Sequence, residues 1–126
     1  MGNPVVHFEL IGPDPARLRE FYGALFGWTA PAGAPVADQV SDPSQYSFID
    51  PAPGAPAAAG GIGGGNGFSN HAIFYVGVED VSSALARAEE LGATIVLQPQ
   101  RNEDGQVTVA HILDPAGNLV GIAGPS

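Results

Sequence analysis

The 126-residue sequence predicts one α+β domain made of two similar βαβββ halves. Length is the first observation, because a chain of this size fits one domain whose core needs no metal or disulfide. The second is a repeated order in which a strand-like segment precedes an aspartate, a helical stretch and a glycine, at Asp14 to Gly27 and at Asp80 to Gly92. Three strand-like segments follow each helix. A repeat of half the chain favours two modules, at about residues 4–65 and 69–124, that cover each other's open sheet faces.

In the first half, residues 5–10 alternate and are rich in strand formers, which predicts a strand. Asp14 is a good N-cap, and the proline after it suits the first helical position. We expect the helix to end at Gly27. Apolar residues at i, i+3, i+4 and i+7 predict its buried face, which comprises Leu18, Phe21, Tyr22 and Leu25.

Residues 28–29 begin a predicted second strand, and residues 46–49 a third. The Pro/Ala/Gly stretch 31–44 between them predicts a loop or a loosely ordered edge. A proline-rich loop at 51–56 comes before the glycine run 60–65. This run lacks the Lys-Ser/Thr ending of a phosphate loop, so we expect its glycines to widen a binding site or to let a bulky ligand lie against the backbone.

The second half repeats the plan. Strands are predicted at 71–78, 93–97, 107–113 and 119–123, with a tight turn at Asp114-Pro115-Ala116-Gly117-Asn118. Asp80 caps the helix and Gly92 closes it. The predicted buried face of this helix comprises Val81, Ala84, Leu85, Ala88 and Leu91.

Charge and composition exclude several classes of partner. Thirteen acidic residues against four basic ones, all arginine, give a net charge of −9, which repels nucleic acid and anionic membranes. The absence of cysteine excludes disulfides and thiolate chemistry. We see no signal-peptide pattern and no apolar run that could span a membrane, so the expected compartment is the cytoplasm.

Three sequence segments resemble those of the vicinal oxygen chelate superfamily, the group of glyoxalases, bleomycin-resistance proteins and dioxygenases. They are Val6-His7-Phe8-Glu9 with Phe21-Tyr22-Gly23-Ala24-Leu25-Phe26-Gly27-Trp28, then Tyr75-Val76-Gly77-Val78-Glu79-Asp80-Val81 with Ala88-Glu89-Glu90-Leu91-Gly92-Ala93, and finally the Asp114–Asn118 turn. Together they span residues 5–123. The resemblance implies that the two modules form one cup-shaped domain, and that single-domain members pair as homodimers.

The resemblance also implies where a metal would bind. Family enzymes hold a divalent metal at the base of the cup through two histidines and one or two glutamates, and the metal acts as a Lewis acid. His7 matches the first of these positions, whereas the other three are Ile73, Gly121 and, by a less certain alignment, Gly63. Glycine and isoleucine offer no ligand, and three protein ligands are the usual minimum. We therefore expect no metal and no other cofactor.

A shifted metal site is the remaining route to a bound ion, and it would use His7, His71 and either Glu9 or Asp50. Without a metal, the cup can still bind a ligand. The candidate lining residues are His7, Glu9, Trp28, Gly63, His71, Ile73, Tyr75 and Gly121.

These candidates have alternative roles. His7 and Glu9 share a strand face and form either a polar pair that orients a ligand or moves a proton, or a structural hydrogen-bonded pair. Tyr75 either presents a flat surface to a ring-bearing ligand or fills the core. Trp28 is expected at the cup rim or in a dimer contact. The face of His111 stays open, with a structural role favoured.

The predicted function is metal-independent binding of a small apolar or aromatic ligand, as in proteins that sequester antibiotics. An apolar, aromatic-dotted cup with few charges favours this interpretation. The alternative is a glyoxalase-type lyase, isomerase or dioxygenase, which would use a metal or acid–base catalysis by His7, Glu9 or His71. A regulatory or partner-binding domain without a small ligand is a third possibility.

Overall fold

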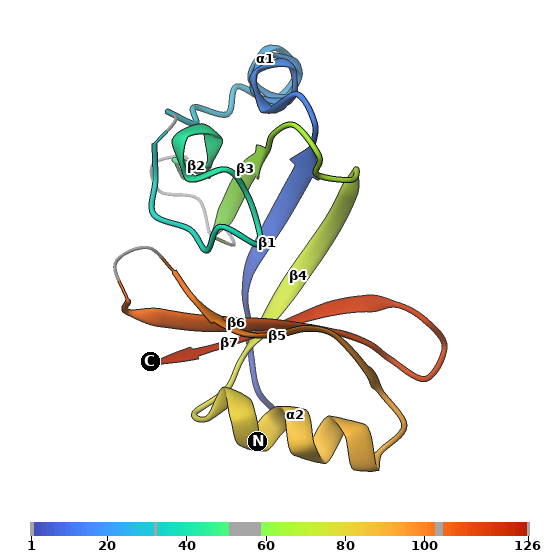
Figure 1. Cartoon of the computed structure of the whole chain (residues 1–126). Helices are drawn as coiled ribbons and strands as arrows, with labels where there is room; N and C mark the ends of the chain where they lie inside the picture. The colour runs from blue at the N-terminus through green and yellow to red at the C-terminus, as the bar shows by residue number, and fades with distance from the viewer. Residues whose placement is uncertain (1, 32, 51–58, 103–104, 126) are drawn as a thin grey trace.

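One mixed sheet of seven strands, in the order β2-β3-β1-β4-β7-β6-β5, forms the backbone of the fold (Figure 1). The computed structural model describes residues 2–31, 33–50, 59–102 and 105–125. The predicted loop at 51–56 lies outside these residues. The elements are β1 (Val5–Gly12), α1 (Pro15–Phe26), the 3-10 turn η1 (Pro43–Gln45), β2 (Ser47–Ile49), β3 (Gly60–Gly64), β4 (His71–Gly77), α2 (Val81–Glu90), β5 (Thr94–Arg101), β6 (Val107–Leu113) and β7 (Leu119–Pro125).

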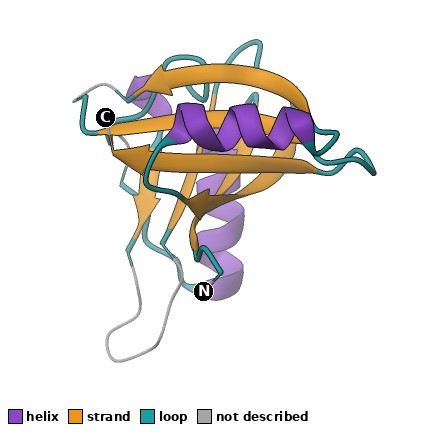
Figure 2. Cartoon of the chain, turned by 90° about the horizontal axis from the view of Figure 1, so that it is seen from below, coloured by secondary structure: helices purple, strands orange, loops and turns teal. Residues whose placement is uncertain are grey.

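The two halves join through their first strands, since β1 pairs antiparallel with β4. Outward from this junction each half repeats one pattern, because β3 lies parallel to β1 and β7 lies parallel to β4. Helix α1 packs against β1 and β3, whereas α2 packs on β5, β6 and β7. Figure 2 shows α2 lying over this second group of strands, roughly along their direction. The predicted α+β class and the two-part repeat are therefore present.

The first half departs from the prediction at the segment after α1. Within the described residues it has three strands, and the expected strand at 28–29 is reduced to one bridge between Thr29 and Asp50. Pro31 and Pro35 follow closely and have no backbone N–H to donate to a neighbouring strand. The prediction of a strand here was wrong.

Both helices begin and end where the sequence predicts. The carboxylate of Asp14 accepts a hydrogen bond from the backbone N–H of Arg17 at 3.2 Å, and that of Asp80 accepts one from Ser83 at 3.1 Å. Gly27 and Gly92 follow the two helices with φ of 72° and 101°, a left-handed conformation that glycine adopts without cost.

The predicted buried face of α1 is wrong in part, because Phe21 and Leu25 are 55% and 59% exposed. Leu18 and Tyr22 are half-buried. The strand under the helix is glycine-rich β3, which presents few side chains, so only a narrow side of α1 finds a partner.

On α2 the prediction is mostly confirmed. Val81 and Leu85 are buried, and the alanines at 84 and 88 are half-buried. Leu91 is exposed, however, because the helix has ended and this residue forms its C-cap. Within the described residues, no helix is long and apolar enough to cross a membrane.

The stretch 31–44 is not a loosely ordered edge. Val36, Ala37 and Val40 are buried and form one core cluster with Ile11 of β1 and Tyr46. Leu97 of β5 and Val109 of β6 pack against this cluster from the other half. The segment therefore folds into the concave side of the sheet and links the two halves.

Hydrogen bonds fix the end of this segment to β3. The backbone N–H of Gly64 donates to the hydroxyl of Ser41 at 2.8 Å, and the N–H of Asp42 donates to the carbonyl of Gly64 at 2.8 Å.

In the second half, the turn before β7 is tight as predicted, since the carboxylate of Asp114 accepts from the N–H groups of Ala116 and Asn118 at 2.9 Å each.

Candidate ligand-binding site

A cavity of about 240 Å³ lies between β1, the 34–40 segment and the strands of the second half. Its walls are largely apolar, with a few polar side chains among them. The lining residues are Val6, His7, Glu9, Pro35, Val36, Ala37, Val40, Tyr46, Phe48, Tyr75, Asn102, Val107, Val109 and Ala123. This composition, apolar with a few convergent polar groups, is typical of small-molecule sites.

Glu9 is the centre of the polar side. Its side chain projects from β1 and is only 4% exposed. One carboxylate oxygen accepts a hydrogen bond from the hydroxyl of Tyr46 at 2.6 Å, and the other accepts one from the hydroxyl of Tyr75 at 2.7 Å. The three side chains come from three different segments, so the tertiary fold brings them together.

A histidine lies beyond each tyrosine. The hydroxyl oxygen of Tyr46 is 2.8 Å from Nε2 of His7, and that of Tyr75 is 2.7 Å from Nε2 of His111. Because each tyrosine gives its one proton to Glu9, its oxygen accepts from the histidine, which fixes Nε2–H as the donor in both rings. The five side chains form one continuous hydrogen-bonded chain across the sheet.

The hydrogen-bonded chain of five side chains determines which of its members are charged. Burial alone would raise the pKa of Glu9, but the nearby His7 and the hydrogen bonds from Tyr46 and Tyr75 outweigh burial and hold this pKa below its ordinary value. Burial, and then the nearby Glu9 carboxylate, raises the pKa of both tyrosines. Burial lowers the pKa of His111. At neutral pH this hydrogen-bonded chain therefore contains an ionised Glu9, two protonated tyrosines and a neutral His111.

Glycines in the sheet make room for both tyrosine rings. A Cβ at Gly61 or Gly63 of β3 would collide with the ring of Tyr46, and a Cβ at Gly121 of β7 would collide with the ring of Tyr75. The expectation that the glycine run opens space for a ligand is thus wrong, because the side chain of Tyr46 fills that space.

The register of the sheet corrects the alignment of the two halves. Glu9 pairs with Gly61 across β1 and β3, and Tyr75 pairs with Gly121 across β4 and β7. Glu9 and Tyr75 each lie five residues before their helix-capping aspartates. Gly61, rather than Gly63, is therefore the counterpart of Gly121.

The residues around the cavity do not fit the metal site that the resemblance implies. Among the described residues, no group of three or more histidines, cysteines, aspartates and glutamates is placed to hold a metal ion. The two carboxylate positions are glycines, and aromatic rings stand where side chains would project from them. A shifted site also lacks support, since His71 is not among the cavity residues and its Nδ1 contacts the Ser69 carbonyl at 2.9 Å.

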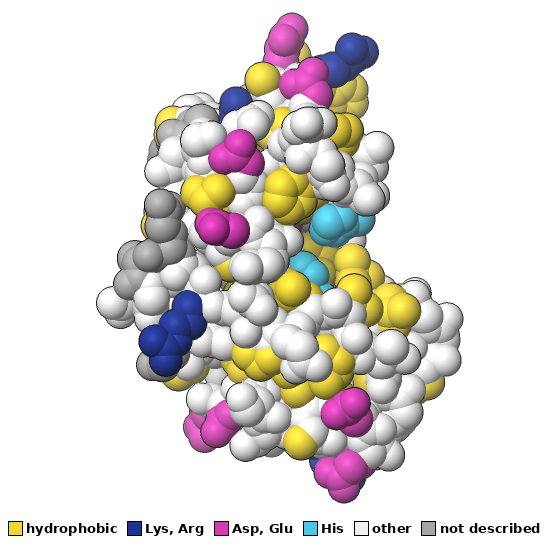
Figure 3. Space-filling model, in the orientation of Figure 1, with side chains coloured by type: hydrophobic (Ala, Val, Ile, Leu, Met, Phe, Trp, Pro, Cys, Tyr) yellow, Lys and Arg dark blue, Asp and Glu magenta, His cyan; other side chains and the backbone are white. Residues whose placement is uncertain are grey.

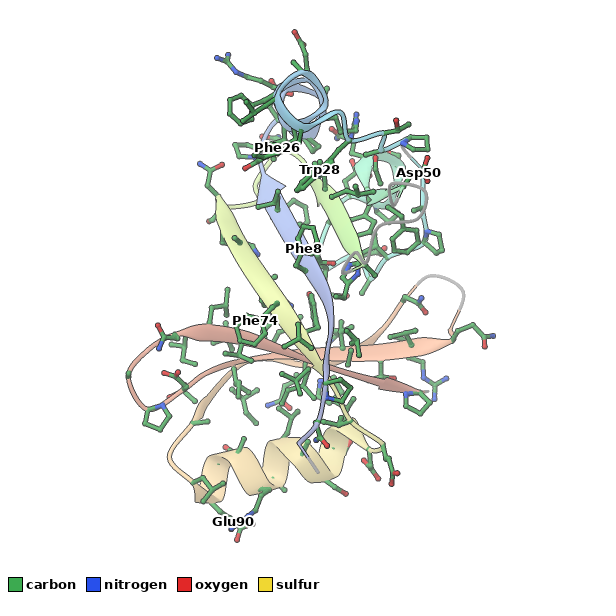
Figure 4. All side chains as sticks on the ribbon, turned by 180° about the vertical axis from the view of Figure 1, so that it is seen from behind. Phe8, Phe26, Trp28, Asp50, Phe74 and Glu90 are labelled. Atoms are coloured by element: carbon green, nitrogen blue, oxygen red, sulfur yellow. The ribbon has the colours of Figure 1, made fainter. Side chains whose placement is uncertain are left out.

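The structure brings together some of the predicted site residues and separates others. His7, Glu9 and Tyr75 line the cavity, whereas Trp28, Gly63, His71, Ile73 and Gly121 do not. Trp28 packs instead on the α1 side of the sheet, with its ring 5.3 Å from that of Phe26 and 6.0 Å from that of Phe8 (Figure 4). Ile73 is buried beside Glu9 in the β1–β4 pair.

Sequence reasoning missed Tyr46 as a site residue and left the face of His111 open. Tyr46 falls at the start of the predicted strand 46–49, but it lies just before β2, and no pattern indicated which face of that strand meets the cavity. One signal was available: glycines at 61 and 63 lie two apart on one strand face and leave a hollow the size of a ring. The space-filling view shows histidine and hydrophobic side chains around a hollow at the waist of the molecule (Figure 3).

Comparisons with known structures agree with this architecture. A Streptomyces coelicolor methylmalonyl-CoA epimerase variant in complex with 2-nitronate-propionyl-CoA superposes with a TM-score of 0.67 at 16% identity, over 98% of each chain. A hypothetical protein from Bacillus halodurans C-125 gives 0.67 at 14% identity, over 100% of this chain and 96% of that one. The Mycobacterium tuberculosis methylmalonyl-CoA epimerase gives a TM-score of 0.66 at 16% identity, over 97% of this chain and 87% of that one.

At these identities the structural likeness establishes the fold alone. No curated protein sequence matches the chain. A family model does match, over residues 5–122, which is nearly the whole sequence. Together with the paired halves and the concave sheet, this match shows that the chain belongs to the Glyoxalase/Bleomycin resistance protein/Dioxygenase superfamily.

Proposed function

We propose that this chain binds a small apolar or aromatic molecule in the cavity without using a metal ion. The observation that carries this proposal is the exchange of ligand-bearing positions for glycines whose space is taken by the rings of Tyr46 and Tyr75. The exchange removes metal ligands and leaves a mostly apolar cavity with a polar, hydrogen-bonded side. Such a site is suited to binding a molecule, whereas the polarisation of a substrate by a Lewis-acidic metal would need ligands that are missing among its described residues.

A ligand screen tests the proposal, with the compound recovered and identified by mass spectrometry. We expect saturable binding with the compound unchanged. Ala123→Leu would place extra carbons in the cavity and should weaken binding, whereas Ala86→Leu on the exposed side of α2 serves as the matched control. Equal binding by the two variants would place the ligand elsewhere.

A metal-independent enzyme is the second candidate, favoured by the continuous chain from His7 to His111. Hydrogen-bonded acids and bases of this kind can move a proton, and His7 borders the cavity. His7→Ala should weaken ligand binding modestly and leave the fold intact under the binding proposal. A loss of turnover by orders of magnitude in that variant would favour the enzyme instead.

Elemental analysis of protein purified without chelators tests the metal-free part of the proposal. Roughly stoichiometric nickel, zinc, manganese or iron would contradict it and would favour a lyase, isomerase or dioxygenase of the glyoxalase type. An acyl-CoA substrate like that of the epimerase neighbour is disfavoured, because its phosphates would meet a protein of net charge −9 and a cavity whose described lining contains no arginine or lysine.

We also propose that two copies of the chain pair through α1. Phe21, Leu25 and Phe26 are each more than half exposed on this helix, and such an apolar patch is typical of an interface. Sedimentation analysis should show a dimer that Phe21→Asp dissociates. Leu91→Asp, at an exposed leucine after α2, is the control, and dissociation by both variants to the same extent would contradict a specific role for α1.

Sequestration of a toxic compound, such as an antibiotic, is the biological role that we propose for this binding. Expression of the chain in a sensitive bacterium should raise the tolerated concentration of the compound that the screen identifies. The Ala123→Leu variant should raise it less.

A further inference from the structure

The cavity contains a buried negative charge that the protein neutralises only in part. Two tyrosine hydroxyls donate to Glu9 and stabilise its ionised form, yet a phenol supplies a dipole rather than a full positive charge. Buried charges in proteins are ordinarily paired or coordinate a metal. Among the described residues, the one basic side chain within 4 Å of the carboxylate is that of His7, whose Nε2 lies 3.7 Å from Oε2.

The carboxylate also keeps acceptor capacity. An ionised carboxylate offers about four lone-pair sites, and the two tyrosine hydroxyls occupy two of them. Nε2 of His7, at 3.7 Å, is too far away to make a hydrogen bond. Glu9 is among the residues that line the cavity, so a ligand there can approach this group.

Aromatic side chains line the cavity together with Glu9. His7 lies between two of them, with its ring centroid 6.0 Å from that of Phe48 and 5.9 Å from that of Tyr75. The ring of Tyr46 meets that of Phe48 edge to face at 5.6 Å. The negative faces of Tyr and Phe rings attract a cation that has left water, and they also accept apolar surface.

From these observations we propose that the ligand carries a cationic amine on an aromatic or apolar body, with the amine directed to Glu9 and the body held by the apolar wall. This inference rests on the proposed binding function and deepens it. The net charge of −9 draws cations toward the protein, and the described lining contains no arginine or lysine to repel them.

The size of the cavity limits what enters it. Its volume of about 240 Å³ exceeds the ~150 Å³ that accommodates benzene in an engineered protein cavity. A single ring with a short aminoalkyl arm therefore fits, and a larger ligand would insert only such a head group.

A series of phenyl compounds that differ in charge tests the inference on the unaltered protein. The probes are benzylammonium, benzyl alcohol and benzoate, with benzyltrimethylammonium as a cation that has no N–H. Affinities come from calorimetry or NMR titration near neutral pH, at low and high salt. We expect benzylammonium to bind roughly tenfold to a hundredfold more tightly than benzyl alcohol, the range for one hydrogen bond to a charged group. Benzoate should bind most weakly.

Glu9→Gln provides the matched variant, because it removes the charge and keeps the shape. It should abolish the preference for benzylammonium over benzyl alcohol, whereas Glu89→Gln on the exposed side of α2 should retain it. If Glu9→Gln fails to fold, the ligand series on the unaltered protein still decides.

The outcomes separate the two proposals. Benzyl alcohol or benzoate binding as tightly as benzylammonium would overturn the charge inference and leave the proposed binding function standing. A preference for the amine that survives Glu9→Gln would overturn the role of Glu9. Binding of none of the four probes up to millimolar concentration would contradict both the inference and the cavity as an aryl-binding site.

Discussion

Replacing Tyr75 by phenylalanine removes one hydroxyl and tests whether the buried chain stabilises the fold. The hydroxyl donates to the carboxylate of Glu9 at 2.7 Å and accepts from His111 at 2.7 Å, and both bonds are buried. A hydrogen bond to a charged group contributes about 1.5–3 kcal/mol, and a neutral one contributes about 1 kcal/mol. We therefore expect Tyr75→Phe to lower the free energy of unfolding by about 2.5–4 kcal/mol near neutral pH.

The same variant should show a characteristic pH dependence. Because the folded-state pKa of Glu9 lies below its ordinary value of 4.5, ionisation of Glu9 stabilises the fold above that value. This contribution disappears as the pH falls through the lowered pKa. Since Tyr75→Phe removes one of the hydrogen bonds that lower the pKa, its destabilising effect should be largest near neutral pH and smaller in acid.

Urea denaturation followed by tryptophan fluorescence measures both effects. Tyr22→Phe is the control, since the hydroxyl of Tyr22 has no hydrogen-bond partner among the described residues and its ring stacks on Trp28. Equal losses for the two variants, or a loss at position 75 that does not change with pH, would refute the assignment of an ionised Glu9 held by tyrosine hydroxyls.

Three further predictions concern the support of the site and the fold. Gly121→Ala should lower the free energy of unfolding by about 1–3 kcal/mol because its methyl group overlaps the Tyr75 ring, whereas Gly2→Ala, with open space around it, should change it little in the same denaturation assay. Val40→Ala should lower the free energy of unfolding by about 2 kcal/mol, as measured by thermal unfolding, and should speed proteolysis between α1 and β2. An unchanged rate of cleavage would contradict the packing of that segment. Asp80→Ala should lower the free energy of unfolding by about 1 kcal/mol through loss of the N-cap of α2. A change of less than a few tenths of a kcal/mol in the same assay would show that the cap contributes little.

The elements that local rules govern could be predicted from the sequence. Alternation located β1, and capping aspartates with left-handed glycines located both helices. Whether an apolar helix face finds a partner is not a local property. The periodicity of α1 therefore predicted burial for Phe21, which the structure leaves exposed.

The site was predictable only where it lies on a regular strand. Parity along β1 placed His7 and Glu9 on one face, and both line the cavity. Tyr46 reaches Glu9 from a position 37 residues away, at the end of an irregular segment whose path no period encodes. The counterpart of Gly121 was misplaced by two residues for a similar reason, because the irregular segment between α1 and β2 gives no fixed spacing from the helix to β3.

The fit between a missing Cβ and a neighbouring ring makes each glycine depend on its tyrosine. A carboxylate side chain could be accommodated at position 121 only after the ring at position 75 had shrunk, and shrinking that ring first would remove one of the two tyrosine hydroxyls that donate to Glu9. Each single mutation toward a carboxylate at these glycines is thus disfavoured, and the glycine and its tyrosine would have to change together.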